Sequence, residues 1–456
     1  MMLFSGGAVV TMDPTIGDLA SGDVLVGGDR IVAVGPDLRS HPEAADATIV
    51  DTTGGIVCPG FVDTHRHAWQ AQLRRSIPDV NDLGEYVMST LVGVAPAYTP
   101  HDMYVGTRLA ALTALDAGIT TMLDFSHNSR SAAHSDAAVQ ALIDTGIRGV
   151  HASMGPHFGD WDKQWPADLV RLREKFHGAN DGLVTVRLAA LATDEIAGPA
   201  LAYGPELAAV ARDLGIGVSI DAVFGESSSA AIERWATDGL LGPAVTLIHA
   251  TGLTGQAWKA IGATGTTVSL APTSEAQIGL ETAVPAIDEA LAVGVRPGLS
   301  IDVEVALASD MFTQMRALHA IQRMRAVHAV YGTDNPVGHR ITTRDVLDFA
   351  TAQGARTNLL GDVTGSISPG KQADLLVVRA DDVNTMPLND AVGTLVLGVD
   401  ARNIDTVVVA GRIRKAAGRL VGVDLDELRR TVTASRDAIR ATVAASTGAS
   451  TAASAG

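Results

Sequence analysis

Two histidines separated by one residue are the strongest chemical signal in this sequence. His65 and His67 lie in the segment PGFVDTHRHAWQ, which begins as an apolar run typical of a buried strand. Residues i and i+2 of a strand point to the same side, so both imidazoles can offer neutral nitrogens to one metal ion. Two surface histidines would give the same spacing, but the preceding Pro-Gly-Phe-Val-Asp run favours a metal site.

The chain around this pair alternates between short apolar runs and amphipathic helical stretches, several of which end in Gly just before the next run. Eight runs are typical of strands: 56–65, 118–126, 147–155, 183–191, 216–223, 245–251, 266–272 and 295–302. Eight β/α units in ~250 residues is the number that a (β/α)8 TIM barrel requires. An open doubly wound sheet is the alternative, and it is disfavoured because no Gly-x-Gly-x-x-Gly follows the first strand.

The two ends of the chain are rich in β-branched residues and lack long helical patterns. In the N-terminal part, DVLVGGDRIVAVG predicts a hairpin. In the C-terminal part, ADLLVVRA, TLVLGV and IDTVVVAGRIRK are typical of strands. Each end is too small for a core of its own, so we expect both to form one discontinuous β-sandwich domain.

The expected organisation is therefore an α/β chain with a TIM-barrel domain at its centre. The expected segments are 1–57 and 365–423 for the β-sandwich, 58–364 for the barrel, 424–443 for a C-terminal helix and 444–456 for a low-complexity, disordered tail. TIM-barrel sites lie at the carboxyl ends of the strands, which is where this organisation puts His65 and His67.

Composition limits the possible partners. The net charge of −17 argues against nucleic acid and anionic membranes, which need basic patches. The single cysteine, Cys58, excludes a disulfide within the chain and a cysteine-based zinc site. No signal peptide and no ~18-residue apolar span is recognisable. We therefore expect a soluble cytoplasmic protein, and the net charge says little about whether its substrate is a small molecule.

Several segments together resemble the amidohydrolase superfamily, in particular its branch of cytosine, guanine and adenosine deaminases and triazine hydrolases. The resemblance covers essentially the whole chain and rests on PGFVDTHRH, GITTMLDFS, VTLIHAT, LAPTSEAQIG, LSIDVEVALASDMFTQMRA and GSISPGKQADLLVV. It implies one divalent metal ion per chain, zinc first with iron or manganese as alternatives. It also implies hydrolysis of a small, often heterocyclic substrate. We expect a homo-oligomer, either a dimer or a tetramer.

Position by position, the resemblance implies roles for four residues. His65, His67 and Asp302 would be metal ligands, and Asp302 would also accept the proton of the attacking water. His249 would orient that water or polarise the substrate. The alternatives are that Asp302 only caps the turn after its strand and that His249 is a structural histidine.

The sequence departs from the family at strand five, where IGVSIDAVFGE has Asp221 at the position of a histidine ligand. The interval from Asp221 to His249 is about one β/α unit, so the position is kept while the residue type changes. A carboxylate can bind a divalent metal, but it makes the ion less electrophilic and its water less acidic. Asp221 is therefore either a further metal ligand or a residue with another purpose in a site that has lost metal affinity.

A second departure follows three residues later, at Phe224. The deaminases of this branch have a glutamate there, which protonates a ring nitrogen during attack. Glu226 could replace it only if the loop is bulged. The other groups that could supply the proton are Asp302, His249 and Glu275.

The lysines give a third clue. The barrel segment contains only Lys163, Lys175 and Lys259, and the fourth strand carries Arg187 instead. A carbamylated lysine bridging two metal ions is therefore not expected.

Barrel geometry adds candidate contacts near the strand ends: Trp69, Gln70, Asp124, His127, His151, His157, Thr273, Ser274, Glu275 and Asp310. Of these, we expect Trp69, Gln70, His157 and Glu275 to contact substrate. The leading hypothesis is a hydrolase with one metal ion that breaks a C–N bond, by deamination or otherwise. The alternatives are a non-deaminating hydrolase, a lyase or rearrangement enzyme with an altered site, and a catalytically silent barrel.

Overall fold

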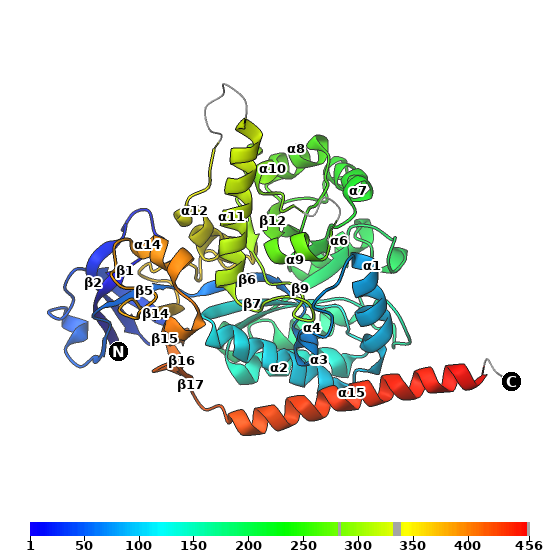
Figure 1. Cartoon of the computed structure of the whole chain (residues 1–456), viewed down its shortest axis with the longest axis horizontal. Helices are drawn as coiled ribbons and strands as arrows, with labels where there is room; N and C mark the ends of the chain where they lie inside the picture. Colours follow the sequence, from blue (N-terminus) through cyan, green and yellow to red (C-terminus); the bar gives the residue numbers. More distant parts are fainter. Residues whose placement is uncertain (281–283, 332–338, 454–456) are drawn as a thin grey trace.

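The computed structural model describes residues 1–280, 284–331 and 339–453, with side chains up to residue 446. The middle of the chain forms a parallel barrel (Figure 1), which confirms the expected fold class. Its eight strands follow one another in chain order: β6 (Phe61–Arg66), β7 (Ile119–Ser126), β8 (Arg148–Ser153), β9 (Val184–Leu191), β10 (Val218–Asp221), β11 (Val245–Ile248), β12 (Thr267–Leu270) and β13 (Gly298–Leu299).

The barrel closes where β6 meets the chain just after the very short strand β13. The backbone N–H of Asp302 donates to the carbonyl of His65 at 2.9 Å, and that of His67 donates to the carbonyl of Asp302 at 3.2 Å. Three residues that the sequence marks as metal ligands are thus held together by their own backbones. We call this contact the seam.

Helices surround the barrel, and several begin or end with local signals that the sequence carries. Thr99 forms a capping box with Asp102 at the start of α2, and Gly146 ends α3 in a left-handed conformation. The helices are α1 (Leu83–Tyr86), α2 (Pro100–Asp116), α3 (Ala132–Thr145), α4 (Asp168–Phe176), α5 (Ala179–Gly182), α6 (Pro205–Leu214), α7 (Gly225–Thr237), α8 (Gly255–Thr264), α9 (Pro272–Gln277), α10 (Ile287–Ala292), α11 (Met311–Val330), α12 (Thr343–Phe349), α13 (Ala352–Thr357), α14 (Ala391–Gly393) and α15 (Leu425–Ala453).

Shorter helical segments connect these elements, and one of them matters for the site. It begins at Leu83 in α1 and continues through a π-helical stretch at Val87–Val94 to a 3-10 turn at Ala95–Ala97. We call residues 83–97 the flap. The remaining 3-10 and π segments are Pro42–Ala44, Ala68–Leu73, Pro199–Leu201, Thr394–Gly398 and Ala401–Asn403.

Strand β6 contains a bulge between Asp63 and Arg66, beside the two histidines. Asp63 pairs with Met122 and Arg66 pairs with Asp124. Strand β6 therefore advances by three residues over a stretch in which β7 advances by two. A bulge re-aims the side chains beside it and is common next to active sites. As a result, Asp63 and Arg66 pair with each other while His65 and His67 both reach Asp302.

Both chain ends contribute to one nine-stranded sheet at the left of Figure 1. Its strands are β1 (Met2–Val9), β2 (Leu19–Gly27), β3 (Arg30–Gly35), β4 (Thr48–Asp51), β5 (Gly55–Pro59), β14 (Leu375–Arg379), β15 (Ile404–Val409), β16 (Arg412–Ala416) and β17 (Arg419–Leu420). The expected hairpin is β2–β3. The two ends share a core that includes Phe4, Val26, Val57, Leu375 and Val408.

Two boundaries differ from the expected ones. The first expected strand, 56–65, is two strands, because β5 belongs to the end sheet and pairs with β14 up to Pro59. The boundary expected at residue 57 therefore falls inside β5. At the C-terminal end, α15 continues to Ala453, so residues 444–453 are helical and not a disordered tail; 454–456 lie outside the described residues. This stretch is rich in Ala, which extends an existing helix at little cost.

The segment TLVLGV is helical and not a strand, which corrects the sequence-based expectation. The Asp390 side chain accepts a hydrogen bond from the N–H of Gly393 and caps the turn that leads into Thr394–Gly398. Leu395 and Val396 are buried, and Arg316 of α11 donates to the carbonyl of Val396 at 3.1 Å. A short apolar run fits either a strand or a buried helix, so its tertiary contacts decide. Among the described residues, no helix combines the length and apolarity needed to cross a membrane.

Candidate metal centre

Four barrel strands bring potential metal ligands to one point. The nitrogen and oxygen donors of His65, His67 and Asp302 lie within 4.8 Å of one another. A second group with the same spacing consists of His65, Asp221 and His249. We call these five residues the metal cluster. The sequence predicted all five, and the structure brings all five together.

Asp302 is the centre of this arrangement. One of its carboxylate oxygens lies 3.1 Å from His65 Nε2 and 3.2 Å from His67 Nε2. The other accepts a hydrogen bond from the hydroxyl of Ser274 and lies 3.8 Å from His249 Nε2. Asp221 completes the cluster, with its Oδ1 3.6 Å from His249 Nε2. The Asp221 carboxylate thus faces the cluster and does not turn away from it.

Two residues of the cluster have left-handed backbones. His249 has φ 64° and Asp302 has φ 66°. A residue with a Cβ pays roughly 1 kcal/mol or more for this conformation, and such residues gather at functional sites. Backbone hydrogen bonds hold both in place, from His249 N–H to Ser269 and from Asp302 N–H to His65.

The orientation of the imidazoles fits a metal ion. His67 Nδ1 donates to the carbonyl of Phe125 at 3.1 Å, and His249 Nδ1 lies 3.3 Å from a carboxylate oxygen of Glu275. Such partners fix the ring and the tautomer of a metal-binding histidine, and in both rings Nε2 faces a carboxylate of the cluster. Asp221 Oδ1 and His65 Nδ1 are buried without a hydrogen-bond partner. The donor set, imidazole nitrogens and carboxylate oxygens, suits zinc, iron or manganese.

Electrostatics separate an acid and a base within the cluster. Burial disfavours the imidazolium of His249, but the hydrogen bond to Glu275 and the two nearby aspartates outweigh burial and raise its pKa to about 9. Burial opposes ionisation of Asp302, yet its contacts with His65 and His67 hold its pKa well below the ordinary value. Asp302 is therefore an ionised carboxylate that can take a proton.

A cavity of about 50 Å³ opens above the metal cluster. His67, Asp221, His249 and Asp302 lie at its polar end. The rest of the wall is mostly apolar and consists of Leu83, Tyr86, Val87, Leu91, Leu191, Ala192, Ile196, Val223, Phe224, Ile278, Leu280 and Val303, with Thr193, Ser274, His127 and His157 as further polar residues. Concave apolar walls with a few polar groups are typical of small-molecule sites.

Of the four residues expected to contact substrate, only His157 lines this cavity. Trp69 is buried behind it, where its ring contacts Tyr98 and His127. Gln70 is also buried and donates to the hydroxyl of Tyr86 at 2.7 Å.

Glu275 lies behind His249, where it also accepts a hydrogen bond from the backbone N–H of Ala271 at 2.9 Å. The structure therefore places Trp69, Gln70 and Glu275 one layer behind the cavity wall. Each contacts a residue that lines the cavity: His127, Tyr86 and His249 respectively.

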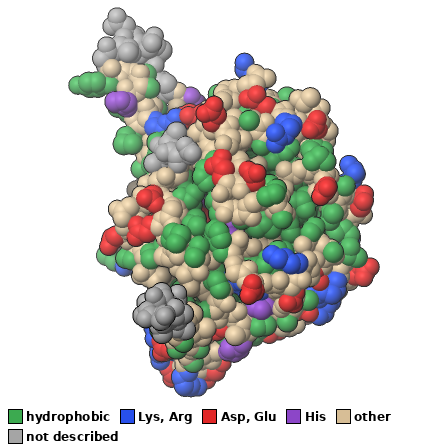
Figure 2. Space-filling model, turned by 90° about the vertical axis from the view of Figure 1, so that its right-hand side faces the viewer, with side chains coloured by type: hydrophobic (Ala, Val, Ile, Leu, Met, Phe, Trp, Pro, Cys, Tyr) green, Lys and Arg blue, Asp and Glu red, His purple; other side chains and the backbone are tan. Residues whose placement is uncertain are grey.

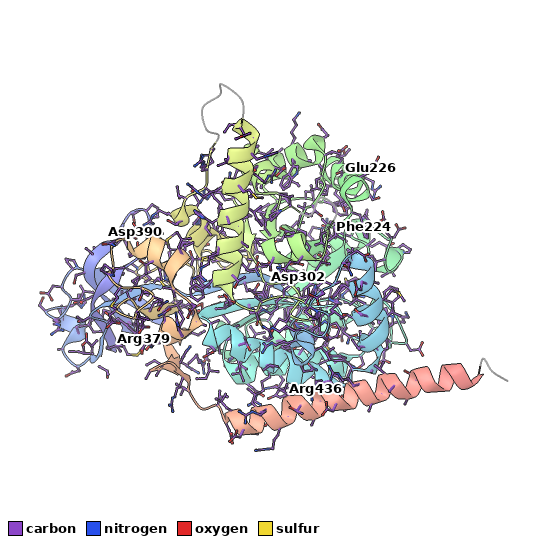
Figure 3. The ribbon with its side chains drawn as sticks, viewed as in Figure 1. Phe224, Glu226, Asp302, Arg379, Asp390 and Arg436 are labelled. Carbon is purple, nitrogen blue, oxygen red and sulfur yellow. The ribbon has the colours of Figure 1, made fainter. Side chains whose placement is uncertain are left out.

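Phe224, which replaces the glutamate of the family, and Glu226, its possible substitute, lie in different environments after β10. Phe224 lines the cavity, whereas Glu226 is exposed in the first turn of α7. Figure 3 shows Glu226 on α7, beyond Phe224 as seen from Asp302. Among the described residues of the wall, an aromatic ring thus occupies the place at which the family resemblance implies a carboxylate.

The other candidates have structural partners. Asp124 pairs with His151 at 3.2 Å, and its other oxygen accepts the N–H of Ala68. Thr273 bonds Gln314, and Asp310 caps α11. Arg187 donates to the carbonyls of Val218 and Thr357, near the start of β10 and away from the metal cluster.

Sequence reasoning missed the flap and the seam. Leu83, Tyr86, Val87 and Leu91 come from the flap, and they carry no pattern that distinguishes them from an ordinary helix. At the seam, Arg66 is fully buried and binds both Asp63, at 2.7 Å, and Glu304, at 3.0 Å. The sequence shows an Arg between the two histidines and a Glu two residues after Asp302. These two residues, Arg66 and Glu304, could have been predicted to pair.

Comparison with known proteins is consistent with this geometry. The sequence model of the amidohydrolase family matches residues 56–414. A 5-methylthioadenosine/S-adenosylhomocysteine deaminase of Symbiobacterium thermophilum is 28% identical over 425 residues, which cover 90% of this chain and 93% of that protein. A 5'-deoxyadenosine deaminase of Methanosarcina mazei is 26% identical over 431 residues, or 91% of this chain and 93% of that protein.

Solved structures share the fold. The zinc complex of an atrazine chlorohydrolase from Arthrobacter aurescens superposes with a TM-score of 0.82 at 21% identity, covering 96% of this chain and 100% of that one. A zinc-bound adenosine deaminase from Xanthomonas campestris gives a TM-score of 0.79 at 22% identity, covering 96% and 98%. Both resemblances extend over the barrel and the end sheet together.

Proposed function

Because this chain belongs to the amidohydrolase family, we propose that it is a metal-dependent hydrolase of a C–N bond in a small heterocyclic substrate. The observation that carries the proposal is the convergence of His65, His67, Asp221, His249 and Asp302 at the polar end of one cavity. A catalytically silent barrel would have no need to keep these donors buried, oriented and, at two positions, strained.

The chain's own residues would divide the work as follows. His65, His67, Asp302 and Asp221 would hold one divalent ion, which when bound lowers the pKa of water toward neutrality. Asp302 would take the proton of the attacking water, since its carboxylate stays ionised. His249, backed by Glu275, would orient the water or donate a hydrogen bond to the substrate.

We further propose zinc as the ion, at one equivalent per chain. The zinc complexes of the two structural neighbours support this choice. A single ion is favoured because β9 has Arg187 and no lysine that could bridge two metal ions. That arginine donates hydrogen bonds to the carbonyls of Thr357 and Val218. A homo-oligomer in the cytoplasm also remains part of the proposal.

A second candidate is hydrolysis that needs no proton on a ring nitrogen, such as amide or ring-opening hydrolysis. Phe224 favours it, because the wall has an aromatic ring where a deaminase of this type needs a carboxylate. The two candidates share the metal cluster and differ in the product. Deamination releases ammonia, whereas the second reaction leaves the nitrogen on an organic product.

The test combines metal analysis with a screen of aminated heterocycles and cyclic amides, including 5-methylthioadenosine. We expect close to one divalent ion per purified chain and turnover that a chelator abolishes and zinc restores. Ammonia and product analysis then separate the two candidates. Full activity in metal-free wild-type protein would overturn the proposal.

A further inference from the structure

The cavity wall has few groups that can donate a hydrogen bond to a ligand. Most of the described lining residues are apolar, and Phe224 stands where the family resemblance implies a carboxylate. Ser274 already donates its hydroxyl proton to Asp302. On the face seen in Figure 2, the side of α1 and α7 in Figure 1, hydrophobic side chains form broad patches near the middle. The few polar side chains of the wall are therefore the ones that can orient a substrate.

Tyr86 is one of these polar groups, and it comes from the flap. Its side chain is 6% exposed and lines the cavity together with His67 and Asp302. Tyr86 lies where α1 passes into the π-helical stretch Val87–Val94, and π-helical turns are rare and frequently occur at functional sites. Phe224 packs against the apolar cluster to which Tyr86 belongs. Tyr86 therefore brings a hydroxyl to the same cavity as the ring that replaces the carboxylate.

Gln70 fixes the Tyr86 hydroxyl. The backbone N–H of Gln70 donates to the carbonyl of the candidate metal ligand His67 at 3.1 Å. The Gln70 side chain is fully buried, and its Nε2 donates to the phenol oxygen of Tyr86 at 2.7 Å. A phenol can both accept and donate a hydrogen bond, and this bond uses its accepting side. Within the described residues no group accepts the hydroxyl proton, so that proton is available to a ligand in the cavity.

The surroundings keep this proton on Tyr86. Burial and the nearby carboxylates of Asp302 and Asp221 raise the pKa of its phenol well above the ordinary value, against the opposite effect of the Gln70 hydrogen bond. A phenol in such surroundings donates hydrogen bonds but does not give up its proton. The influence of the two carboxylates also reflects how close the hydroxyl lies to the metal cluster.

The histidines of the wall are less well fixed as donors toward a substrate. His249 contacts Glu275 through Nδ1, and its Nε2 faces the carboxylates of the metal cluster. Nδ1 of His127 and Nδ1 of His157 are buried without a hydrogen-bond partner. No contact at these two atoms therefore sets which ring nitrogen carries the proton. The hydroxyl of Tyr86, by contrast, has its accepting side occupied and its proton free.

From this arrangement we infer that Tyr86 is a catalytic residue whose hydroxyl, positioned by Gln70, donates a hydrogen bond to the substrate heteroatom bonded to the carbon that water attacks. That atom is a ring nitrogen in a deamination and a carbonyl oxygen in an amide hydrolysis, and in both it gains negative charge during the attack. A fixed donor aimed at developing charge lowers the barrier. No proton leaves Tyr86, and the proton of the water goes to Asp302. The inference rests on the proposed function, because it assigns a role within that hydrolysis.

Tyr86→Phe removes the hydroxyl and keeps the ring. In the zinc-loaded protein, with the most active compound of the heterocycle and cyclic-amide screen, we expect kcat to fall about hundredfold while KM changes less than about threefold and metal content stays the same. Tyr98→Phe is the matched control, because Tyr98 is also buried, its hydroxyl has no hydrogen-bond partner and it does not line the cavity. Retained kcat in Tyr86→Phe, or an equal loss in Tyr98→Phe, would overturn the inference.

A second measurement needs no turnover. In protein labelled with 3-fluorotyrosine, each of the five tyrosines gives a fluorine NMR signal, and comparison with Tyr86→Phe assigns the signal of Tyr86. The probes are 5-methylthioadenosine, adenine and the cyclic amide 2-piperidone, each added to the zinc-loaded protein.

The 1-deaza analogues of the two purines are the controls, because a C–H replaces the ring nitrogen next to the amino-bearing carbon. We expect the acceptor-bearing probes to move the Tyr86 signal more than their 1-deaza analogues do, and to bind about fivefold to tenfold more tightly. In Tyr86→Phe this difference in affinity should disappear. No response of Tyr86 to any acceptor-bearing probe at millimolar concentration would also overturn the inference.

Gln70→Met tests the positioning role, because it keeps a side chain of similar length and removes the group that donates to Tyr86. We expect about a tenfold loss in kcat with unchanged metal content. Combined with Tyr86→Phe, it should cost no more than Tyr86→Phe alone, because Gln70 acts through the hydroxyl. Losses that add up in the double variant would show that Gln70 does not act through Tyr86.

Failure of this inference and failure of the proposed function are distinguishable. Metal-dependent hydrolysis that Tyr86→Phe leaves intact would remove the inference and keep the proposed function. A Tyr86 signal that responds to acceptor-bearing probes, in a protein that hydrolyses none of the screened compounds with any metal, would remove the proposed hydrolase and leave Tyr86 as the hydrogen-bond donor of the cavity.

Discussion

Two buried polar clusters lie on either side of strand β6, and they differ in how completely their groups are paired. On one side, Asp63, Arg66, Arg74 and Glu304 form an ionic cluster whose side chains are saturated with partners. On the other side, the metal cluster keeps Asp221 Oδ1 and His65 Nδ1 buried without a hydrogen bond. Both clusters contain carboxylates at the seam, and both are almost closed to solvent.

The ionic cluster holds the seam together. Asp63 Oδ1 accepts the backbone N–H of Ile301 at 3.1 Å and that of His65 at 3.4 Å, so it bridges both sides of the seam. Because β13 has only two residues, few ladder hydrogen bonds are available there. The difference teaches that buried charge by itself does not mark a reactive site. The metal cluster is marked instead by nitrogen and oxygen donors that converge on one point, among them Asp221 Oδ1, because burying such an atom without a partner is costly unless a ligand uses it.

The largest expected effect is on the metal cluster itself. His65→Ala combined with His67→Ala should reduce the metal content from about one ion per chain to near zero and lower kcat/KM by ~10³-fold or more. Some loss of stability is also expected, because the double substitution leaves the buried carboxylate of Asp302 and the carbonyl of Phe125 without their histidine partners. Elemental analysis and chemical denaturation measure the two quantities, and retained metal would contradict the assignment of the ligands.

In the ionic cluster, the main expected effect is on stability and not on metal content. Arg66→Met leaves Asp63 buried without a cationic partner and Glu304 with Arg74 alone, and it should lower the free energy of unfolding by about 3–5 kcal/mol. Arg66→Lys keeps the charge but cannot bridge both carboxylates, so an intermediate loss is expected.

The control for this prediction is Arg436→Met on α15, labelled in Figure 3, whose ion pair with Asp437 is exposed. It should change the free energy of unfolding by less than about 0.5 kcal/mol. Denaturant titration compares the three variants. An equal effect of Arg66→Met and Arg436→Met would show that the ionic cluster does not hold the seam.

A smaller effect on metal affinity is expected for substitutions of Asp221, which test whether this residue is a fourth protein ligand of the metal ion. Asp221→Ala should weaken zinc affinity at least about tenfold. Asp221→His should bind zinc at least as tightly as the wild type, yet its turnover of the native substrate should fall, because the loaded centre gains a positive charge. Competition with a chelator gives the affinities. Unchanged affinity in Asp221→Ala would assign Asp221 to substrate contact.

The smallest effect is expected at Glu275, which contacts His249 but does not line the cavity. Glu275→Gln keeps an oxygen that can accept from His249 Nδ1 and removes only the charge. We expect about a tenfold loss in kcat with unchanged metal content and KM. Glu275→Ala, which also removes the acceptor, should lose more. A rise in KM with an unchanged kcat would instead make Glu275 a substrate contact.

The barrel was predictable because its signals are local. Alternating strand and helix patterns, glycine helix ends and the His-x-His pair can each be read within a few residues. The β6 bulge and the helical Thr394–Gly398 were not predictable in this way. A bulge is set by register against β7, and a short apolar run takes its conformation from the elements that bury it.

Local sequence patterns thus determine the order of the strands and the identity of the side chains that end them, including His65, His67, His249 and Asp302. Tertiary structure decides which of these side chains meet. Only the closed barrel shows that Asp221 faces the metal cluster, that Glu275 stands behind His249, and that Phe224, rather than Glu226, lines the cavity. The physical reason is distance along the chain: Asp302 is bonded to His65 across 237 residues, and no local pattern encodes such a contact.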